Sequence, residues 1–282
     1  MGGKKKETQP KYKNSLTNNK MLNYQVYVPG TVEKIAICLV LFVAGGVVGL
    51  IFYGGLFKND GYTTMATRIS DVFFVIVMGL IAVKFFYPVI IKSRLEKRNK
   101  KLRNEFKDML SSLSASISSG SNVQKAFQDT YKDLLLQYSE NDMIVQEVSE
   151  ILTGVAQNIN IETMIKDMGV RSGNDDILCF ADVFETCIRK GGDLKSVIRK
   201  TYDAIVEKSA IEDEIDTKLT SNKLQHNIMS LMPIFVVAML KYTNETFSEN
   251  FATFTGVLVN TVAIGIFIAS YKYGQKICDI EV

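Results

Sequence analysis

The sequence predicts an all-α protein that is held in a membrane by about four transmembrane helices and carries an antiparallel helical bundle in the cytoplasm. Three observations support this prediction: apolar and charged residues are segregated along the chain, lysine and arginine cluster beside the apolar segments, and the charged region shows helical periodicity. Hydrophobic residues make up 47% of the 282 residues and charged residues 22%. A purely soluble fold does not explain why the apolar residues are concentrated in long uncharged stretches.

Four apolar segments are candidate membrane spans. Ile35–Phe57 and Phe251–Tyr271 contain no charged residue, and each exceeds the roughly 20 residues that cross a bilayer core. Val72–Ile91 also qualifies if Lys84 extends its ammonium group toward the interface. Ile228–Leu240 is short, so its length fits a buried core helix as well as a span. We include it as a span because the topology then closes.

The distribution of lysine and arginine predicts the orientation. Residues 1–34 carry seven of them, the loop 58–71 carries two, and 92–103, which follows Pro88 at the end of a predicted span, carries seven. The segment 241–253 has one lysine and two glutamates. Since cytoplasmic flanks are enriched in lysine and arginine, both termini and the central region are expected in the cytoplasm, and the protein in the cell membrane.

These boundaries divide the chain into five parts. Residues 1–31 form a basic tail that we expect to be disordered, 32–91 hold two transmembrane helices, 92–223 form the cytoplasmic helical domain, 224–271 hold two further transmembrane helices, and 272–282 form a cytoplasmic tail. No signal peptide is predicted. The four cysteines form no CxxC pair, so neither a zinc site nor a disulfide framework is indicated. No metal and no cofactor are expected.

A first helical hairpin is predicted around residue 120. Gly120 can adopt the left-handed conformation that ends a helix, and Asn122 can cap the next helix with its side chain. The apolar stripe before the turn, at helical spacing, is Phe106, Leu110, Leu113 and Ile117, and the apolar face after it is Val123, Ala126, Phe127, Tyr131 and Leu134.

The same plan recurs about 71 residues later. Gly191 and Gly192 end a second helix, and Asp193 can cap the one that follows. The matched positions suggest a pseudo-repeat of two related hairpins in an antiparallel bundle. The stripe before this turn is Ile177, Phe180, Phe184 and Ile188, and the face after it is Leu194, Val197, Ile198, Tyr202 and Ile205.

Shorter helices are expected between the hairpins, at Met143–Leu152 and Ile161–Met168, with Asn160 capping the second. Arg171–Asp176 is expected to be a loop. The helix that starts after Asp193 can continue toward the third span, since the chain has no proline between residues 88 and 233. A continuous helix of that length would either transmit movement or act as a static anchor.

No arrangement of residues predicts an enzyme. The single histidine, His226, is read as an interfacial residue, and the acidic group 212–216 as a solvated helix face or a docking surface for a basic partner. A GxxxxGK[ST] nucleotide loop is lacking. Gly45 and Gly49 have the GxxxG spacing of closely packed membrane helices, and Asn260 is expected to hydrogen-bond to a neighbouring helix.

The segments Phe106–Gly120 and Asn122–Phe127, together with the glycine-pair segment Phe180–Leu194, resemble the F domain of type II secretion systems. Pro233 falls where that family places a proline just inside the following span, and Lys276–Val282 is similar to the ending of TadB-type proteins of tight-adherence pilus loci. The resemblance covers roughly residues 90–282. The single F domain favours the tight-adherence (Flp pilus) branch, with TadB- and TadC-like members.

The resemblance implies an inner-membrane platform protein that couples a separate, hexameric TadA-like secretion ATPase to pilin extraction and filament assembly. The implied partners are that ATPase, pilin subunits, membrane lipid, and a paralogous platform protein or further copies of the chain. Nucleic acid is not expected as a partner. Two alternatives stay open: a membrane scaffold or signalling protein that binds another cytoplasmic partner, and an enzyme acting on lipid at the interface.

Overall fold

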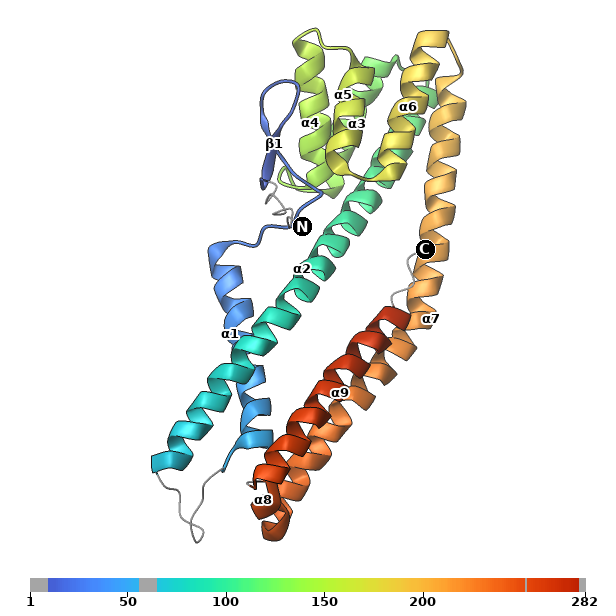
Figure 1. Cartoon of the computed structure of the whole chain (residues 1–282). Coiled ribbons are helices and arrows are strands. Elements are labelled where there is room, and N and C mark those ends of the chain that lie inside the picture. The colour runs from blue at the N-terminus through green and yellow to red at the C-terminus, as the bar shows by residue number, and fades with distance from the viewer. Residues whose placement is uncertain (1–9, 56–64, 252, 279–282) are drawn as a thin grey trace, which may run out of the picture. The chain divides into compact units, whose positions relative to one another are not determined.

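The computed structural model describes residues 10–55, 65–251 and 253–278, and most of these residues are helical (Figure 1). This agrees with the all-α prediction. The elements are strands β1 (Tyr12–Asn14) and β2 (Lys20–Leu22) and helices α1 (Thr31–Tyr53), α2 (Met65–Ser118), α3 (Val123–Gln137), α4 (Met143–Ala156), α5 (Ile161–Ser172), α6 (Asp175–Lys190), α7 (Leu194–Thr243), α8 (Glu245–Phe251) and α9 (Phe254–Cys278).

The chain divides into two compact units. Residues up to Val28 together with Ile91–Ala210 form one, here called the globular unit. Pro29–Ile90 and the residues from Ile211 onward form the other, here called the apolar unit. Helices α2 and α7 each contribute residues to both units.

The globular unit is built around the apolar stripes that the sequence predicts. Phe106, Leu110 and Leu113 of α2 are fully buried, and so are Phe180 and Phe184 of α6. The ring centroids of Phe106 and Phe180 lie 5.5 Å apart with an edge-to-face tilt, a favourable geometry for aromatic pairs. The two stripes therefore share one core, with α3, α4 and α5 packed consecutively beside it.

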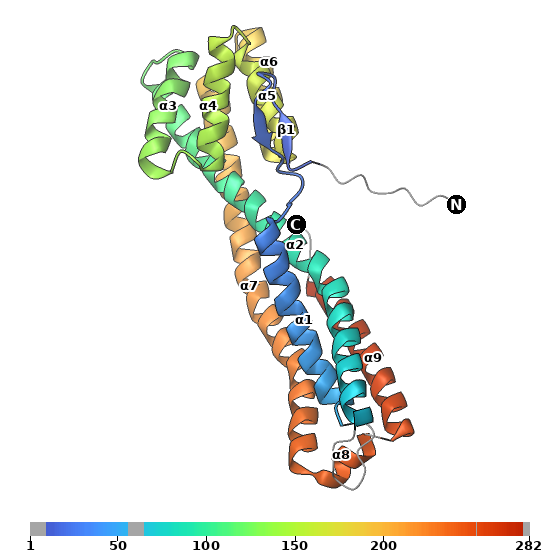
Figure 2. The same ribbon diagram turned by 90° about the vertical axis from the view of Figure 1, so that its left-hand side faces the viewer.

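Residues 10–28 form a folded hairpin, so the expectation of disorder through residue 31 is wrong for the part of the tail that the structure describes. β1 and β2 pair antiparallel, and the hairpin lies beside α4 and α5 (Figures 1 and 2). Tyr24 is only 1% exposed, and Leu22 packs against the core. The hairpin folds because its polar side chains find buried partners in α4. Residues 1–9 lie outside the described residues.

The predicted loop Arg171–Asp176 is also largely wrong. Helix α5 continues through Ser172, and α6 begins at Asp175. Only Gly173, at φ +62°, and Asn174 separate the two helices. The Oδ1 of Asn174 accepts hydrogen bonds from the backbone N–H groups of Asp176 and Ile177, which caps α6.

Helices α4 and α5 occur where shorter helices were expected. Asn160 occupies the N-cap position of α5, but its side chain makes no capping hydrogen bond. Both helices extend beyond their predicted ends, because their last turns carry residues buried in the globular unit. Gly154 is buried at the end of α4, and Ser172 at the end of α5.

Three helices among the described residues are long and apolar enough to cross a membrane. They are Thr31–Tyr53, the helix containing Thr67–Ser118, and Thr255–Gly274. Asn227–Thr243, where the third span was predicted, is a shorter apolar segment within α7. The three long helices support the prediction that the chain is a membrane protein.

Pro88, which marks the end of the predicted second span, does not end helix α2. Pro88 lies inside a helix that runs on to Ser118. A proline within a helix costs about 3 kcal/mol or more, because its ring displaces a backbone hydrogen bond. Burial of Leu102, Phe106 and Met109 further along the same helix offsets that cost.

Helices α1 and α2 pack closely in the apolar unit through glycine. A Cβ added at Gly45 would lie 2.6 Å from the Cβ of Ala82, and one at Gly49 would lie 3.1 Å from the Cβ of Met78. Only hydrogen atoms at these positions allow so close an approach. The GxxxG face of α1 therefore packs against α2 of the same chain.

Candidate functional site

The first predicted turn joins α2 to α3. Gly120 has φ +92°, the left-handed conformation that the sequence predicts. The N–H groups of Gly120 and Ser121 donate to the carbonyls of Ile117 and Ser116, the paired bonds of a Schellman helix end. The Oδ1 of Asn122 then accepts from the N–H of Lys125 at 2.8 Å. The helix end and the cap are thus set by adjacent residues.

The second turn joins α6 to α7 in the same way. Gly191 has φ +69° and ψ +37°, and the N–H of Gly192 donates to the carbonyl of Cys187 at 2.9 Å. The Oδ1 of Asp193 accepts from the N–H of Ser196 at 3.2 Å, capping α7. A Cβ at Gly192 would lie 2.8 Å from the Sγ of Cys187, so this glycine permits a close side-chain contact.

Both turns lie at the end of the globular unit that is drawn uppermost in Figure 1. Their apolar faces meet in the shared core, where the rings of Phe127 and Phe184 are 6.3 Å apart and edge to face. Pro233, the remaining residue singled out in the sequence, lies inside α7 in the apolar unit. It belongs to a different part of the molecule from the two turns.

A buried ion pair that the sequence did not predict lies beneath the hairpin. The guanidinium of Arg171 donates to both carboxylate oxygens of Glu147, at 2.9 and 2.7 Å, and to Asp167 at 2.6 Å. The Arg171 and Glu147 side chains are 5% and 0% exposed. The hydroxyl of Tyr24 donates to Glu147 at 2.9 Å. The hairpin therefore completes the hydrogen bonding of a carboxylate that water does not reach.

The electrostatics follow from this geometry. Burial alone would lower the pKa of Arg171, but the carboxylates of Glu147 and Asp167 raise it above its ordinary value. Burial and the neighbouring Glu147 carboxylate raise the pKa of Tyr24 well above its ordinary value. Arg171 therefore stays charged and Tyr24 stays neutral at any physiological pH.

A second carboxylate of α4 holds the tip of the hairpin. Glu150 accepts hydrogen bonds from the hydroxyls of Ser15 and Thr17 and, at 2.9 Å, from the Nδ2 of Asn19. Burial works to raise the pKa of Glu150, but these three donors outweigh burial and lower it below its ordinary value. The tip is thus bound by hydrogen bonds to a charged acceptor, which are about twice as strong as neutral ones.

The hairpin is also held where it leads toward α1. The Nη2 of Arg98 on α2 donates to the carbonyls of Asn23, Tyr24 and Val26, at 3.1, 3.1 and 2.9 Å, and its guanidinium lies over the Tyr27 ring at 5.4 Å. Arg98 thus joins the last turn of the hairpin segment to α2. The sequence analysis counted this arginine only as a topology signal.

The apolar unit has its own polar contacts around the end of α1. The Nδ2 of Asn260 on α9 donates to the carbonyl of Phe52 at 3.4 Å, as expected for a membrane helix residue bonded to its neighbour. The hydroxyls of Tyr53 and Thr261 are 2.9 Å apart. The ammonium of Lys241 on α7 donates to the carbonyls of Ile51 and Gly54, at 3.0 and 2.5 Å.

No group of three or more His, Cys, Asp or Glu residues that could hold a metal ion occurs among the described residues. The side chain of His226 lies outside what the structure describes, so its interfacial interpretation stays a prediction. In the acidic segment, Glu214 pairs with Lys218 at 2.7 Å on an exposed helix face. That contact fits the solvated face that was the simpler of the two interpretations.

The chain was compared with protein-family models, curated proteins and solved structures, and none of the three comparisons found a match.

Proposed function

We propose that this chain is an inner-membrane platform protein of a tight-adherence pilus or type II secretion-like machine, and that it couples a cytoplasmic secretion ATPase to pilin extraction and filament assembly. The observation that carries the proposal is the pair of capped turns at Gly120 and Gly191, in the segments that resemble the F domain. They occur in a chain with three helices able to span a membrane.

The proposed topology has four spans, with both termini and the globular unit in the cytoplasm. The lysine and arginine distribution supports the orientation. The contacts of Lys241 with the end of α1 support the short α7 segment as the third of these spans, because they bring the end of that segment beside a helix that is long enough to cross. Reporter fusions after Tyr62, Asn141, Asn244 and Val282 should read outside, inside, outside and inside. An external reading at Val282 would mean that Ile228–Leu240 does not span.

The proposed mechanism assigns energy conversion to the partner. The chain has no nucleotide loop of the GxxxxGK[ST] type, and its globular unit packs two hairpins on one aromatic core. Close-packed interiors transmit displacement with little compression. The ATPase is therefore proposed to act on the globular unit. The proposed second partner, a paralogous platform protein or another copy of the chain, would complete the assembly that extracts pilins.

The test uses the full chain in its own membrane. The gene neighbourhood should encode a secretion ATPase and small pilin precursors, and that ATPase should co-purify with the tagged chain from detergent extracts. Deletion of the chain should abolish the pili, and the wild-type gene should restore them. Pili that assemble normally without the chain would exclude the platform function. Recovery of an unrelated cytoplasmic partner instead would favour the scaffold or signalling alternative.

A further inference from the structure

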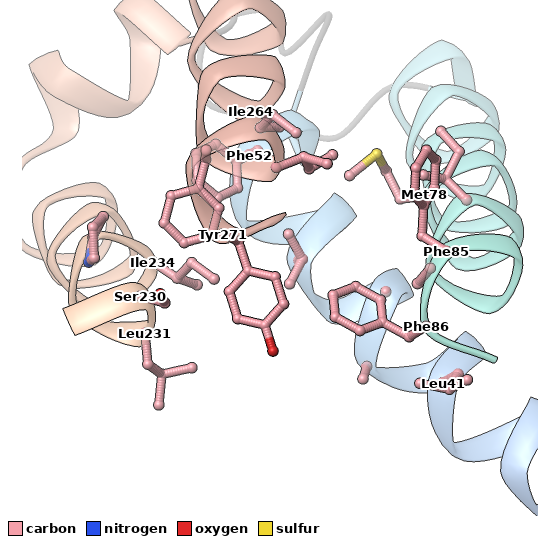
Figure 3. Close-up of a pocket in the computed structure, with 18 of the residues that line it drawn as sticks. Leu41, Phe52, Met78, Phe85, Phe86, Ser230, Leu231, Ile234, Ile264 and Tyr271 are labelled. Atoms are coloured by element: carbon pink, nitrogen blue, oxygen red, sulfur yellow. The ribbon is translucent and has the colours of Figure 1, made fainter. Parts of the chain in front are cut away.

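The apolar unit contains a cavity of about 550 Å³ between α1, α2, α7 and α9 (Figure 3). All four helices contribute side chains to it. Phe52 and Leu41 come from α1, Phe85 and Phe86 from α2, Ile234 from α7 and Tyr271 from α9. The walls are almost entirely aliphatic and aromatic, so the cavity suits an apolar occupant.

The polar groups of the cavity are gathered at one end. Asn227 and Ser230 line it at the start of the α7 segment, and Tyr271 and Lys272 at the last positions of α9 that reach it. The Tyr271 ring lies 5.8 Å from Phe86, toward the end of the α2 segment. The opposite end, near Phe52, has only apolar walls. An occupant must therefore be apolar along its length and polar at one terminus.

The charge at the polar end is positive. The ammonium of Lys272 lies 4.4 Å from the centre of the Phe85 ring, and it forms no ion pair with any residue that the structure describes. The lining includes no aspartate or glutamate. Basic pockets between membrane helices on the cytoplasmic side attract anionic head groups, and in the proposed topology this is the cytoplasmic end.

The size of the cavity suits an acyl chain. If each methylene takes roughly the 30 Å³ of a water molecule, a volume of about 550 Å³ holds about 18 carbons. An apolar chain of that length with one polar end matches both the apolar walls and the single charged end, so a lipid chain is the occupant that the lining favours.

The geometry points to a binding site for one acyl chain of an anionic glycerophospholipid, with the chain between the four helices and the phosphate at Lys272. This inference adds a ligand to the apolar unit and does not depend on the platform function. The lipid would fill the space between α1 and α2 on one side and α7 and α9 on the other, and so would set the distance between these two pairs of helices.

The chain has no tryptophan, so a single introduced tryptophan reports on one position. Phe267→Trp places it among the residues that line the cavity, and Ile266→Trp places it at the neighbouring position, which is 66% exposed and does not line the cavity. The full chain is reconstituted into phosphatidylcholine vesicles in which the same minor fraction is brominated phosphatidylglycerol or brominated phosphatidylcholine. Bromine on the acyl chain quenches a tryptophan that it contacts.

Tryptophan at 267 should be quenched about fivefold more effectively by brominated phosphatidylglycerol, because its head group has a net negative charge that the phosphatidylcholine head group lacks, and one lysine near such a head group contributes about 1 kcal/mol. Tryptophan at 266 should show no preference. Lys272→Gln in the Phe267→Trp background should remove the preference, while Lys84→Gln, at an exposed lysine outside the cavity, should keep it. Circular dichroism and size exclusion of each variant establish that it is folded.

Three results would overturn the inference. Equal quenching of position 267 by both lipids would mean ordinary contact with bulk lipid. Quenching at 266 with none at 267 would mean that the cavity is closed or filled by protein. A preference that survives Lys272→Gln would mean that the head group is bound elsewhere. Phe52→Trp, at the apolar end of the cavity, is a second reporter should the 267 variant fail to fold.

Discussion

Replacing Arg171 by glutamine tests whether the buried ion pair holds the hairpin and α4 together. The substitution removes the guanidinium that donates two hydrogen bonds to Glu147. It leaves the carboxylate, which is fully buried, with Tyr24 as its remaining hydrogen-bond donor among those described. The variant therefore contains a buried charge without its counterion.

The expected cost is about 3–5 kcal/mol, the range for removing one partner of a buried pair. Most of this is the desolvation of Glu147, which has no compensation in the variant. The matched control is Arg199→Gln. Arg199 pairs with Asp203 four residues later at 3.5 Å, but the two side chains are 70% and 59% exposed. Exposed pairs of this kind contribute at most about 0.5 kcal/mol.

Hydrogen exchange of the full chain in detergent, read by mass spectrometry, measures the effect where it occurs. Each 1.4 kcal/mol corresponds to a tenfold change in an equilibrium, so protection in α4, α5 and the hairpin should fall by more than about a hundredfold in Arg171→Gln. Arg199→Gln should leave these segments within about threefold of the wild type. Protection of the α4 amides at the wild-type level in Arg171→Gln would refute the reasoning.

A triple variant tests whether the destabilisation in Arg171→Gln comes from the unpaired buried charge of Glu147 or from the loss of a stabilising ion pair. Replacing Arg171 by Met, Glu147 by Leu and Tyr24 by Phe removes both charges of the ion pair. It also removes the Tyr24 hydroxyl that donates a hydrogen bond to Glu147. Buried pairs replaced by apolar residues of similar volume are often neutral or stabilising. The triple variant should therefore recover much of the protection lost in the single one. A triple variant less protected than Arg171→Gln would mean that the pair itself contributes the stability.

Three further predictions concern a turn, a membrane contact and a titration. Gly191→Val should destabilise the globular unit by about 1 kcal/mol or more, because φ is +69° there. Gly191→Asn should destabilise it less. Thermal unfolding followed by circular dichroism compares the two variants, and equal melting temperatures would contradict a left-handed helix end at Gly191. Gly45→Leu should lower the melting temperature in detergent, because a Cβ at this position would lie 2.6 Å from the Cβ of Ala82. Gly265→Leu should not lower it, because nothing lies within 4 Å of a Cβ at that position. Equal effects of the two substitutions would mean that α1 and α2 do not pack through glycine. The lowered pKa of Glu150 makes the ionised carboxylate stabilising above its unfolded-state pKa of about 4.5, and that contribution is lost as the pH falls through the lower folded-state value. Hairpin exchange, corrected for its intrinsic pH dependence, should therefore differ between the wild type and Glu150→Gln at neutral pH. The two should converge as the pH falls below the lowered folded-state pKa of Glu150; a difference that stays constant with pH would mean that ionised Glu150 is not its source.

The capped turns were predictable because their signals are local. A glycine that ends an apolar stripe, followed within two residues by Asn122 or Asp193, specifies a left-handed helix end and a cap without reference to the rest of the chain. The apolar stripes were equally predictable, since the helical spacing of apolar residues repeats within each helix. Both depend on residues a few positions apart.

The polar cluster was not predictable in this way. Ser15 and Tyr24 bond to carboxylates 135 and 123 residues away, and nothing in the basic, low-complexity look of the N-terminal segment marks it as an ordered hairpin. Arg171 was placed in a predicted loop. Charged residues are seldom fully buried without a partner, and the partner that permits its burial, Glu147, lies in another helix. Residues 20–24 show no clear alternation either, since the buried Met21, Asn23 and Tyr24 do not follow a period of two.

In the apolar unit, the short α7 segment was ambiguous by length alone. Its contact with α1 through Lys241 depends on two backbone carbonyls, which no residue pattern encodes. Pro88 marks the end of a predicted span and still lies inside α2, because packing further along the helix offsets its local preference to end one.

The contacts around the end of α1 determine how freely the apolar helices can turn about their axes. Asn260 is 6% exposed and reaches Phe52, and one residue later Thr261 meets Tyr53. Rotating α9 by one residue, about 100°, would face the Asn260 amide toward hydrocarbon, where an unpaired polar group costs several kcal/mol. Lys241 restrains α7 in a similar manner, because its ammonium donates to the carbonyls of Ile51 and Gly54 at the end of α1. A displacement of α7 or α9 along its axis would therefore move α1 together with it. Little of that displacement would be lost as rotation of the helices against one another.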